Sequence, residues 1–347
     1  MRPTGEVGFV EWERARRRLW RAWALVVLAS STGCAASSPS VLHAKGPAER
    51  QVTGLWWSML AVSVVVIVFV VVMGGWGVVK TRRRREEDIH RDVPWGDRFI
   101  LISGIGITGA ILVAFFLVSL RSMATLARAR PSSVEITITG HDWWWEARYP
   151  NGAVTANEIH IPAGERVQIN LRSADVIHSL WVPELAPKID LIPGRENEMW
   201  IQANQPGQYR GQCAEFCGLQ HAHMIFFVIA DTPADFNTWM QDMAAPALAP
   251  ATPIAVQGQQ VFLSNTCIGC HSIRGTSANG QLGPDLTHMA TRATIGAGTL
   301  PLTPQTLTQW ILAPEQIKPG VTMPPTSLTP DEVRALVTYL LSLGFKS

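Results

Sequence analysis

The stretch Gly211-Gln212-Cys213-Ala214-Glu215-Phe216-Cys217-Gly218-Leu219-Gln220-His221-Ala222-His223-Met224 gathers thiol, imidazole and thioether side chains within twelve residues. It lies near the end of a region, 134–230, made of short alternating or β-branched segments that Pro-Gly and Ala-Gly turns separate. Period-two alternation bounded by such turns is typical of β-strands. We therefore predict a compact antiparallel β-sandwich over 131–232, with the sulfur-rich stretch at one end.

Soft sulfur ligands combined with imidazole favour copper that cycles between its two oxidation states. A mononuclear blue-copper site needs one Cys, two His and a weak axial Met, which Cys217, His178, His221 and Met224 would already supply. The additional Cys213 favours two copper ions that two thiolates bridge. A zinc site of two Cys and two His is the alternative, but zinc does not explain the methionine.

Further along the chain, Cys267-Ile268-Gly269-Cys270-His271 is the attachment pattern of a c-type haem, in which two thiols form thioethers and the imidazole binds iron. Met323, in a loop that Pro324 and Pro325 stiffen just before the last helix, is the favoured sixth ligand. Met289 is its competitor, but only 17 residues separate it from His271. Zinc at the two cysteines is a further alternative, although no second cysteine pair remains. We predict a small all-α cytochrome c domain over 254–347.

The last helix of this domain has a clear start signal. Thr329 offers an N-cap, Pro330 suits the first helical position, and Glu332 completes a capping box ahead of an apolar face. Before the domain, residues 244–253 are rich in Ala and Pro, and they predict a semi-rigid linker.

The N-terminal third of the chain predicts export and membrane insertion. Residues 1–34 combine an arginine-rich start, a short apolar run and small residues, which is the pattern of a signal peptide. Gly33-Cys34 resembles the end of a lipoprotein signal, and plain cleavage nearby or an uncleaved anchor is the alternative. An N-terminal extension over 35–54 follows.

Two uncharged apolar segments, 55–79 and 99–120, are each long enough to cross a bilayer as a helix, so they predict a membrane α-hairpin. The segment between them, 80–98, contains four consecutive arginines and belongs in the cytoplasm by the positive-inside rule. Everything after the second span then lies outside.

Composition agrees with a membrane protein, because 47% of the residues are hydrophobic and only 16% are charged. Residues 131–232 hold 12 Asp and Glu against 6 Lys and Arg, which argues against a nucleic-acid partner. Two disulfides and one leftover thiol would also use the five cysteines, but both close pairs stand beside further ligand-type residues that a disulfide does not require.

At these motifs the chain closely resembles subunit II of the haem-copper cytochrome oxidases, whose β domain is cupredoxin-like and carries the dinuclear CuA centre. The resemblance covers about 55–230. It implies that Cys213 and Cys217 bridge the copper ions and that His178 and His221 each bind one. It also implies an axial Met224, a ligand carbonyl at Glu215, and a magnesium ion that the Glu215 side chain shares with subunit I.

Two further segments carry the resemblance: Gly140-His141-Asp142-Trp143-Trp144-Trp145 matches the family's aromatic stretch, and 188–195 matches its loop toward subunit I. In that family, electrons from cytochrome c enter at the residue that matches Trp143, so the resemblance implies the same role for Trp143. Strand packing explains Trp144 and Trp145 equally well, and His141, His160 and His223 are not expected to be ligands. Only Asp97 stands where the family has a glutamate at a proton path.

The resemblance implies a subunit of an aerobic cytochrome c oxidase in the inner membrane of a bacterium. Electrons would pass from cytochrome c or a cytochrome bc complex through haem and copper to subunit I, where oxygen is reduced with proton pumping; subunit III would be a further partner. A membrane-tethered electron carrier is the alternative from another class. Nitrous oxide reductases share the copper motif, but they need a large additional histidine-rich domain.

Overall fold

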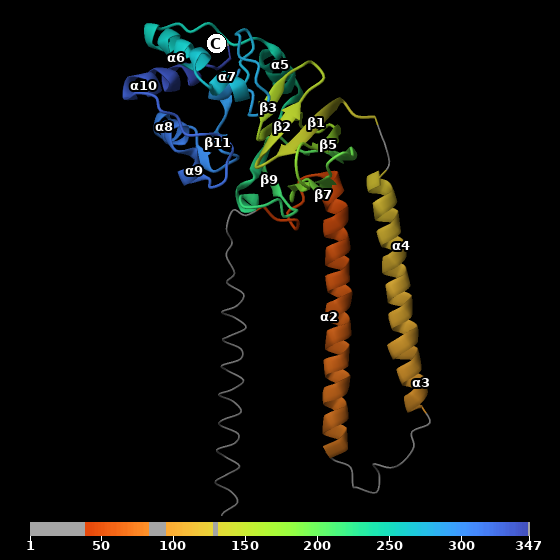
Figure 1. Cartoon of the computed structure of the whole chain (residues 1–347). Coiled ribbons are helices and arrows are strands. Elements are labelled where there is room, and N and C mark those ends of the chain that lie inside the picture. Colours follow the sequence, from red (N-terminus) through yellow and green to blue (C-terminus); the bar gives the residue numbers. More distant parts are fainter. Residues whose placement is uncertain (1–38, 83–94, 128–130, 346–347) are drawn as a thin grey trace, which may run out of the picture. The chain divides into compact units, whose positions relative to one another are not determined.

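The computed structural model describes residues 39–82, 95–127 and 131–345. The predicted signal over 1–34, Cys34, and most of the predicted cytoplasmic loop lie outside these residues. The described chain from Ser40 onward belongs to one compact unit (Figure 1). It consists of two long helices, a β-sandwich and a helical C-terminal domain.

Both predicted spans lie in long helices. The first is α2 (Pro47–Arg82); the second joins α3 (Gly96–Ile100), the π-helical η2 (Leu101–Ile107) and α4 (Thr108–Ala127). Segments Pro47–Thr81 and Gly96–Ala127 are long and apolar enough to cross a membrane, and neither is buried within the protein. At about 1.5 Å per residue each exceeds the ~30 Å hydrocarbon core.

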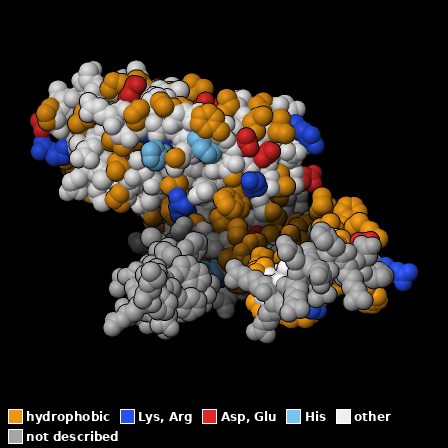
Figure 2. Space-filling model, turned by 90° about the horizontal axis from the view of Figure 1, so that it is seen from below, with side chains coloured by type: hydrophobic (Ala, Val, Ile, Leu, Met, Phe, Trp, Pro, Cys, Tyr) orange, Lys and Arg blue, Asp and Glu red, His pale blue; other side chains and the backbone are white. Residues whose placement is uncertain are grey.

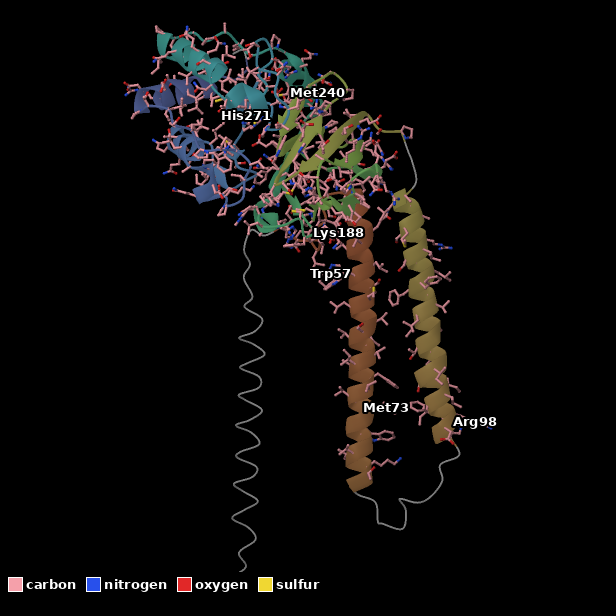
Figure 3. The ribbon with its side chains drawn as sticks, viewed as in Figure 1. Trp57, Met73, Arg98, Lys188, Met240 and His271 are labelled. Atoms are coloured by element: carbon pink, nitrogen blue, oxygen red, sulfur yellow. The ribbon has the colours of Figure 1, made fainter. Side chains whose placement is uncertain are left out.

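The side chains of these helices point outward. Figure 2 shows hydrophobic side chains gathered around the two helices seen end-on, whereas all kinds are mixed over the remaining surface. Trp57 and Met73 project from α2, and Arg98 lies near the start of the second helix (Figure 3). Trp57 is about half exposed, as expected of a side chain that lipid would cover.

The region 131–232 folds as the predicted sandwich of two five-stranded sheets, with strand orders β3-β2-β1-β5-β8 and β4-β10-β9-β6-β7. The strands are β1 (Val134–His141), β2 (Trp144–Arg148), β3 (Val154–Ala156), β4 (Glu158–Pro162), β5 (Val167–Ser173), β6 (His178–Val182), β7 (Ala186–Leu191), β8 (Asn197–Ile201), β9 (Gly207–Cys213) and β10 (Ile225–Asp231). Their inward side chains form one buried cluster that includes Ile136, Ile169, Leu180 and Phe226.

The prediction of a purely antiparallel sandwich is wrong at two places. Strand β1 runs parallel to β5, and β10 runs parallel to β4. Both pairs join strands far apart in the chain, and alternation in sequence reports which face a residue occupies but not the direction of a distant partner.

The sequence also did not predict helix α5 (Pro233–Ala244), which follows the last strand directly. Its N-cap is Thr232, whose hydroxyl accepts a hydrogen bond from the backbone N–H of Asp235. Phe236, Trp239 and Met243 are buried in the sandwich core, so the helix belongs to the β domain.

The C-terminal domain is helical, as predicted, with α6 (Pro253–Ser264), α7 (Cys267–Cys270), α8 (Pro304–Leu312), α9 (Pro314–Ile317) and α10 (Pro330–Leu340). It also holds the short η4 (Met289–Thr291) and a ladder of β11 (Thr294–Ile295) and β12 (Leu300–Pro301). The predicted capping box of Thr329 and Glu332 starts α10.

Helices α6 and α10 cross at close range. A Cβ atom on Gly258 would lie 2.0 Å from the carbonyl oxygen of Ala335, so any other residue here would force the two helices apart. One turn later, the rings of Phe262 and Tyr339 pack with centroids 6.3 Å apart. This crossing is the centre of the second buried cluster of the molecule.

Candidate metal centres

The sandwich brings the sulfur-rich stretch and a distant histidine together. Cys213 ends β9, and His178 begins β6, its neighbour in the same sheet, where Leu180 pairs with Cys213. The turn η3 (His221–His223) then leads to Met224 just before β10. The predicted copper ligands from 213–224 therefore reach the same sheet end as His178.

The distances fit one cluster of ligands. The Sγ atom of Cys217 lies 3.8 Å from Cys213 Sγ, 3.6 Å from His221 Nδ1 and 3.8 Å from Met224 Sδ. The ligand atoms of His178, Cys213 and Cys217 all lie within 4.8 Å of one another, and all three residues are buried.

The Glu215 backbone carbonyl faces the same cluster, with its oxygen 3.2 Å from Cys213 Sγ. The Glu215 side chain is exposed and points out of the cluster's buried interior. The backbone and the side chain of this residue are therefore available to different partners, as the family resemblance requires.

His178 supplies an independent test of whether a metal fits. Its Nε2 atom hydrogen-bonds the Asp175 carboxylate at 2.7 Å. Its Nδ1 atom is buried and has no hydrogen-bond partner among the described residues. A buried polar atom without a partner costs free energy. A soft metal ion bound between this ring nitrogen and the two sulfurs would supply the missing partner. The donor set therefore fits copper.

The charges of the cluster are strongly coupled. The contact between the two sulfurs lowers the pKa of Cys213 to about 3 and raises that of Cys217. Burial lowers the pKa of His178, but the Asp175 carboxylate and the Cys213 sulfur outweigh burial and raise it to about 9. A second thiolate is therefore disfavoured unless further positive charge, such as that of a metal ion, is present.

Residues around the cluster hold it in place. A Cβ atom on Gly140 would lie 2.7 Å from the His178 ring, so β1 presses directly on that imidazole. The Trp143 indole N–H donates to the Cys217 carbonyl at 2.8 Å, and Trp145 packs edge-on against His178. Trp145 is fully buried, as expected of strand packing, whereas Trp143 is half-buried.

The three other histidines of the copper domain, which we did not expect to be ligands, have partners of their own. His141 stacks on Trp144, and the His223 Nδ1 atom hydrogen-bonds Gln220. His160 hydrogen-bonds the Asp231 carboxylate at 2.7 Å. Sequence reasoning missed Asp175, although its position three residues before His178 is a usable signal.

The haem-attachment pattern has suitable local geometry. Cys267 and Cys270 form one turn, α7, which places both sulfurs on the same side of the chain. His271 Nδ1 lies 2.8 Å from the Pro284 carbonyl oxygen, which can only accept, so Nδ1 carries the proton and Nε2 is free to bind iron. Burial lowers the pKa of His271, which favours the neutral form that a metal needs. These residues fit a haem.

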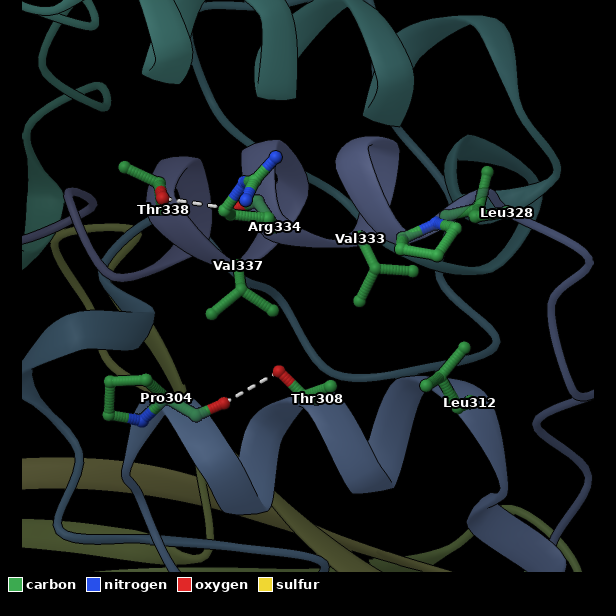
Figure 4. Close-up of a pocket in the computed structure, with 9 residues that line it drawn as sticks. Pro304, Thr308, Leu312, Leu328, Val333, Arg334, Val337 and Thr338 are labelled. Atoms are coloured by element: carbon green, nitrogen blue, oxygen red, sulfur yellow. Dashed lines mark hydrogen bonds between the residues drawn. The ribbon is translucent and has the colours of Figure 1, made fainter.

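The two candidate axial methionines differ in their surroundings. Met289 is 4% exposed and packs in the core of the domain, whereas Met323 is half-buried in the loop before α10. A groove of about 360 Å³ separates α8 from α10, and Figure 4 shows Val333 and Val337 facing Thr308 across it. None of Cys267, Cys270, His271 and Met323 lines this groove, so we do not assign it to the haem.

Comparison with known proteins follows the same division into domains. Residues 152–231 match the family model of the cytochrome c oxidase subunit II periplasmic domain, and residues 255–344 match that of cytochrome c. A crystal structure of the periplasmic domain of cytochrome oxidase subunit II from Bradyrhizobium japonicum aligns at 30% identity, with a TM-score of 0.32, over 33% of this chain and 95% of that one.

Two curated relatives, both cytochrome c oxidase subunit 2, extend the match. The protein from Alkalihalophilus pseudofirmus is 41% identical over 214 residues, which cover 61% of this chain and 62% of the relative. The protein from Bacillus sp. strain PS3 is 32% identical over 246 residues, 67% of this chain and 68% of that protein. A periplasmic domain behind two apolar helices makes the chain a membrane protein with its soluble part outside, and the two domain families imply copper and haem. The chain belongs to the cytochrome c oxidase subunit 2 family.

Proposed function

We propose that this chain is the electron-accepting subunit of a bacterial aerobic terminal cytochrome c oxidase. It takes electrons from a donor outside the membrane and delivers them to subunit I, where oxygen is reduced to water with proton pumping. The observation that carries the proposal is the buried cluster of Cys213, Cys217, His178 and Met224 in a chain that also carries the Cys267–His271 haem pattern.

Cys213 and Cys217 would bridge two copper ions, with one imidazole for each ion from His178 and His221. Met224 and the Glu215 carbonyl would complete the two shells. The hydrogen bond from His178 to Asp175 fixes the imidazole so that Nδ1 faces the sulfurs. Strands β6 and β9 hold both sides of the cluster, so little movement is needed when its charge changes.

Cys267 and Cys270 would attach the haem covalently, and His271 and Met323 would bind its iron. Pro284 orients the His271 ring through the hydrogen bond at Nδ1. Met323 is the better axial candidate because packing does not occupy its side chain as it does that of Met289. When bound, haem and copper supply one-electron redox chemistry; the protein supplies their spacing and their environment.

Trp143 is our candidate for the residue through which electrons reach the copper cluster. Its indole N–H donates to the carbonyl of Cys217, a proposed bridging ligand, so one hydrogen bond joins the ring to the cluster. The half-buried ring also has access to groups outside the sandwich.

The partners follow from the exposed parts of the copper domain. Residues 188–195, which form the end of β7 and the turn after it, are largely exposed, and we propose that they and the Glu215 side chain face subunit I, with magnesium shared between the two subunits. We further propose that the complex lies in the inner membrane and includes subunit III. Its electron donor would be cytochrome c or a cytochrome bc complex. Asp97, exposed at the start of the second long helix, is the candidate for the mouth of a proton path.

A difference spectrum tests this function. The native complex is purified from membranes through a tag on this chain, and its reduced-minus-oxidised spectrum is recorded together with the electron paramagnetic resonance of copper. We expect a-type or other oxidase haem signals beside the c-type signal, and a mixed-valence copper signal. A preparation that holds only c-type haem would instead identify a membrane-tethered electron carrier.

A further inference from the structure

Lys318, at the end of α9, is buried although it is a lysine. Only 2% of its surface is exposed, and it is among the largest fully buried side chains of the molecule. Among the described residues it forms no ion pair. A buried ammonium without a carboxylate is unusual and needs other groups that favour its charge.

Three backbone carbonyls meet that need. The Nζ atom donates to the carbonyl oxygens of Trp143, His223 and Gly296, each at 2.9 Å. A lysine ammonium has three N–H donors, so its capacity is fully used. Trp143 and His223 belong to the copper domain, whereas Gly296 and Lys318 belong to the haem domain. The ammonium therefore joins the two domains.

The neighbours of Lys318 contact the same part of the copper domain. The Pro319 carbonyl accepts a hydrogen bond from the Gln220 side chain at 2.8 Å. A Cβ atom on Gly320 would lie 3.3 Å from the Trp143 ring and 3.1 Å from Leu219. Segment 318–320 thus lies against both Trp143 and the loop that carries the proposed copper ligands.

Two hydrogen bonds farther along the same interface report directly on whether the domains stay together. The backbone N–H of Ile225 donates to the Ala297 carbonyl at 3.2 Å, and the backbone N–H of Ala293 donates to the Glu158 carboxylate at 2.8 Å. Each bond has one partner in each domain, so neither amide can be protected by its own domain alone.

We infer that Lys318 is a positioning residue that fixes the haem domain on the copper domain and holds Trp143 between the two redox centres. The purpose that we assign to this docking, electron transfer from haem to copper, rests on the proposed function. The docking itself does not depend on that function. The transfer that it serves moves one electron from the haem, which is oxidised, to the copper centre, which is reduced. Burial lowers the pKa of Lys318 to about 8, so the ammonium is still the main form at pH 7.

Hydrogen exchange at single-residue resolution tests the docking in the purified, metal-loaded complex. Lys318→Met removes the ammonium and keeps the unbranched, apolar part of the side chain, and Arg334→Met removes an exposed cation from the same domain as the matched control. We expect Lys318→Met to accelerate exchange at Ile225 and Ala293 by about tenfold or more, the factor that corresponds to about 1.4 kcal/mol. Arg334→Met should leave both amides unchanged.

Two internal amides separate undocking from unfolding. Phe227 donates to Asn157 within the copper domain, and Leu286 donates to Ser272 within the haem domain. Both should keep their protection in Lys318→Met. Unchanged exchange at Ile225 and Ala293 would overturn the inference. Where Lys318→Met does not yield loaded protein, Lys318→Gln, which keeps an N–H donor, is measured in its place with the same expected direction.

A second measurement follows the electron after rapid photoreduction of the haem. Lys318→Met should slow its arrival at copper about tenfold, with the copper signal and the haem potential unchanged; the copper potential is measured in the same variant and the rate is compared at equal driving force, because the Lys318 charge interacts with Cys217. Normal arrival in this variant would refute the positioning role and leave the proposed function intact. No arrival in the unmodified protein, with Ile225 and Ala293 protected, would refute the proposed relay and the purpose assigned to Lys318, but not the docking.

Discussion

Replacement of Gly258 by alanine tests the helix crossing that supports the haem domain. The new Cβ atom would lie 2.0 Å from the Ala335 carbonyl oxygen, 2.5 Å from its carbon and 2.7 Å from Tyr339 Cβ. Two of these atoms are backbone atoms of α10, so the whole helix must move. Overpacking of this kind costs about 3 kcal/mol at the upper end of its usual range. The better helix propensity of alanine returns about 1 kcal/mol.

We therefore expect a net loss of about 2 kcal/mol, which in a domain of this size lowers the midpoint of thermal unfolding by roughly 8–16 °C. The haem absorption of the purified full-length protein follows this transition. Gly344→Ala is the control, because a Cβ atom there has no heavy atom within 4 Å, and its midpoint should barely change. Equal midpoints for both variants would show that the α6–α10 crossing is not as tight as described.

Three other predictions concern the two centres. Cys217→Ser should abolish the mixed-valence copper signal in electron paramagnetic resonance and leave the haem spectrum intact, because only Cys213 then remains as a thiolate; an unchanged signal contradicts a dicopper centre. Met323→Leu should remove the weak long-wavelength sulfur-to-iron absorption and lower the haem potential, whereas Met289→Leu should do neither; the reverse pattern in a redox titration assigns the ligand to Met289. A chain cut after Ala251 should assemble with copper but be driven poorly by its natural donor, and a basic cytochrome c should restore turnover partly at low ionic strength; full turnover with the natural donor would make the haem domain optional.

The sequence was most informative where chemistry depends on close spacing. The pattern of Cys213, Cys217, His221 and Met224 lies on one loop, so its meaning needs no knowledge of the fold. His178 lies 35 residues before Cys213, and only the pairing of β6 with β9 brings it to the thiols. The donor set that copper needs and the family resemblance pointed to His178, and periodicity could not have done so.

Contacts between distant segments were the part that could not be predicted. The parallel pairing of β1 with β5 leaves no trace in the alternation of either strand. Nothing in the sequence distinguishes Lys318 from a surface lysine, because the three carbonyls that surround it lie 22 to 175 residues away. A buried lysine is recognised from its neighbours, and its own sequence neighbourhood of Gln, Ile, Pro and Gly says nothing about them.

The linker is a further example, and it affects how the domains meet. Its Ala/Pro composition predicted a semi-rigid spacer, yet the Ala247 amide donates to the Arg274 carbonyl, and the Arg274 guanidinium donates to the carbonyls of Met243 and Ala244. His288 hydrogen-bonds the Ala245 carbonyl. A spacer whose first half is bonded to the haem domain restricts the relative motion of the domains more than its composition suggests, which raises the effective concentration of one domain at the other.

The same contacts bear on how a soluble donor reaches the chain. A donor that docked at Trp143 would have to displace 318–320. Gly320 lies against the Trp143 ring, and the Lys318 ammonium donates to the backbone carbonyl of Trp143. The acidic copper domain, with 12 acidic against 6 basic residues, attracts a basic protein, but salt screens that attraction beyond about 8 Å at physiological ionic strength. The hydrogen bonds of Lys318 are buried and are not screened in this way. We therefore expect entry through the haem domain to dominate at every ionic strength, and added salt to change only the rate at which the donor arrives.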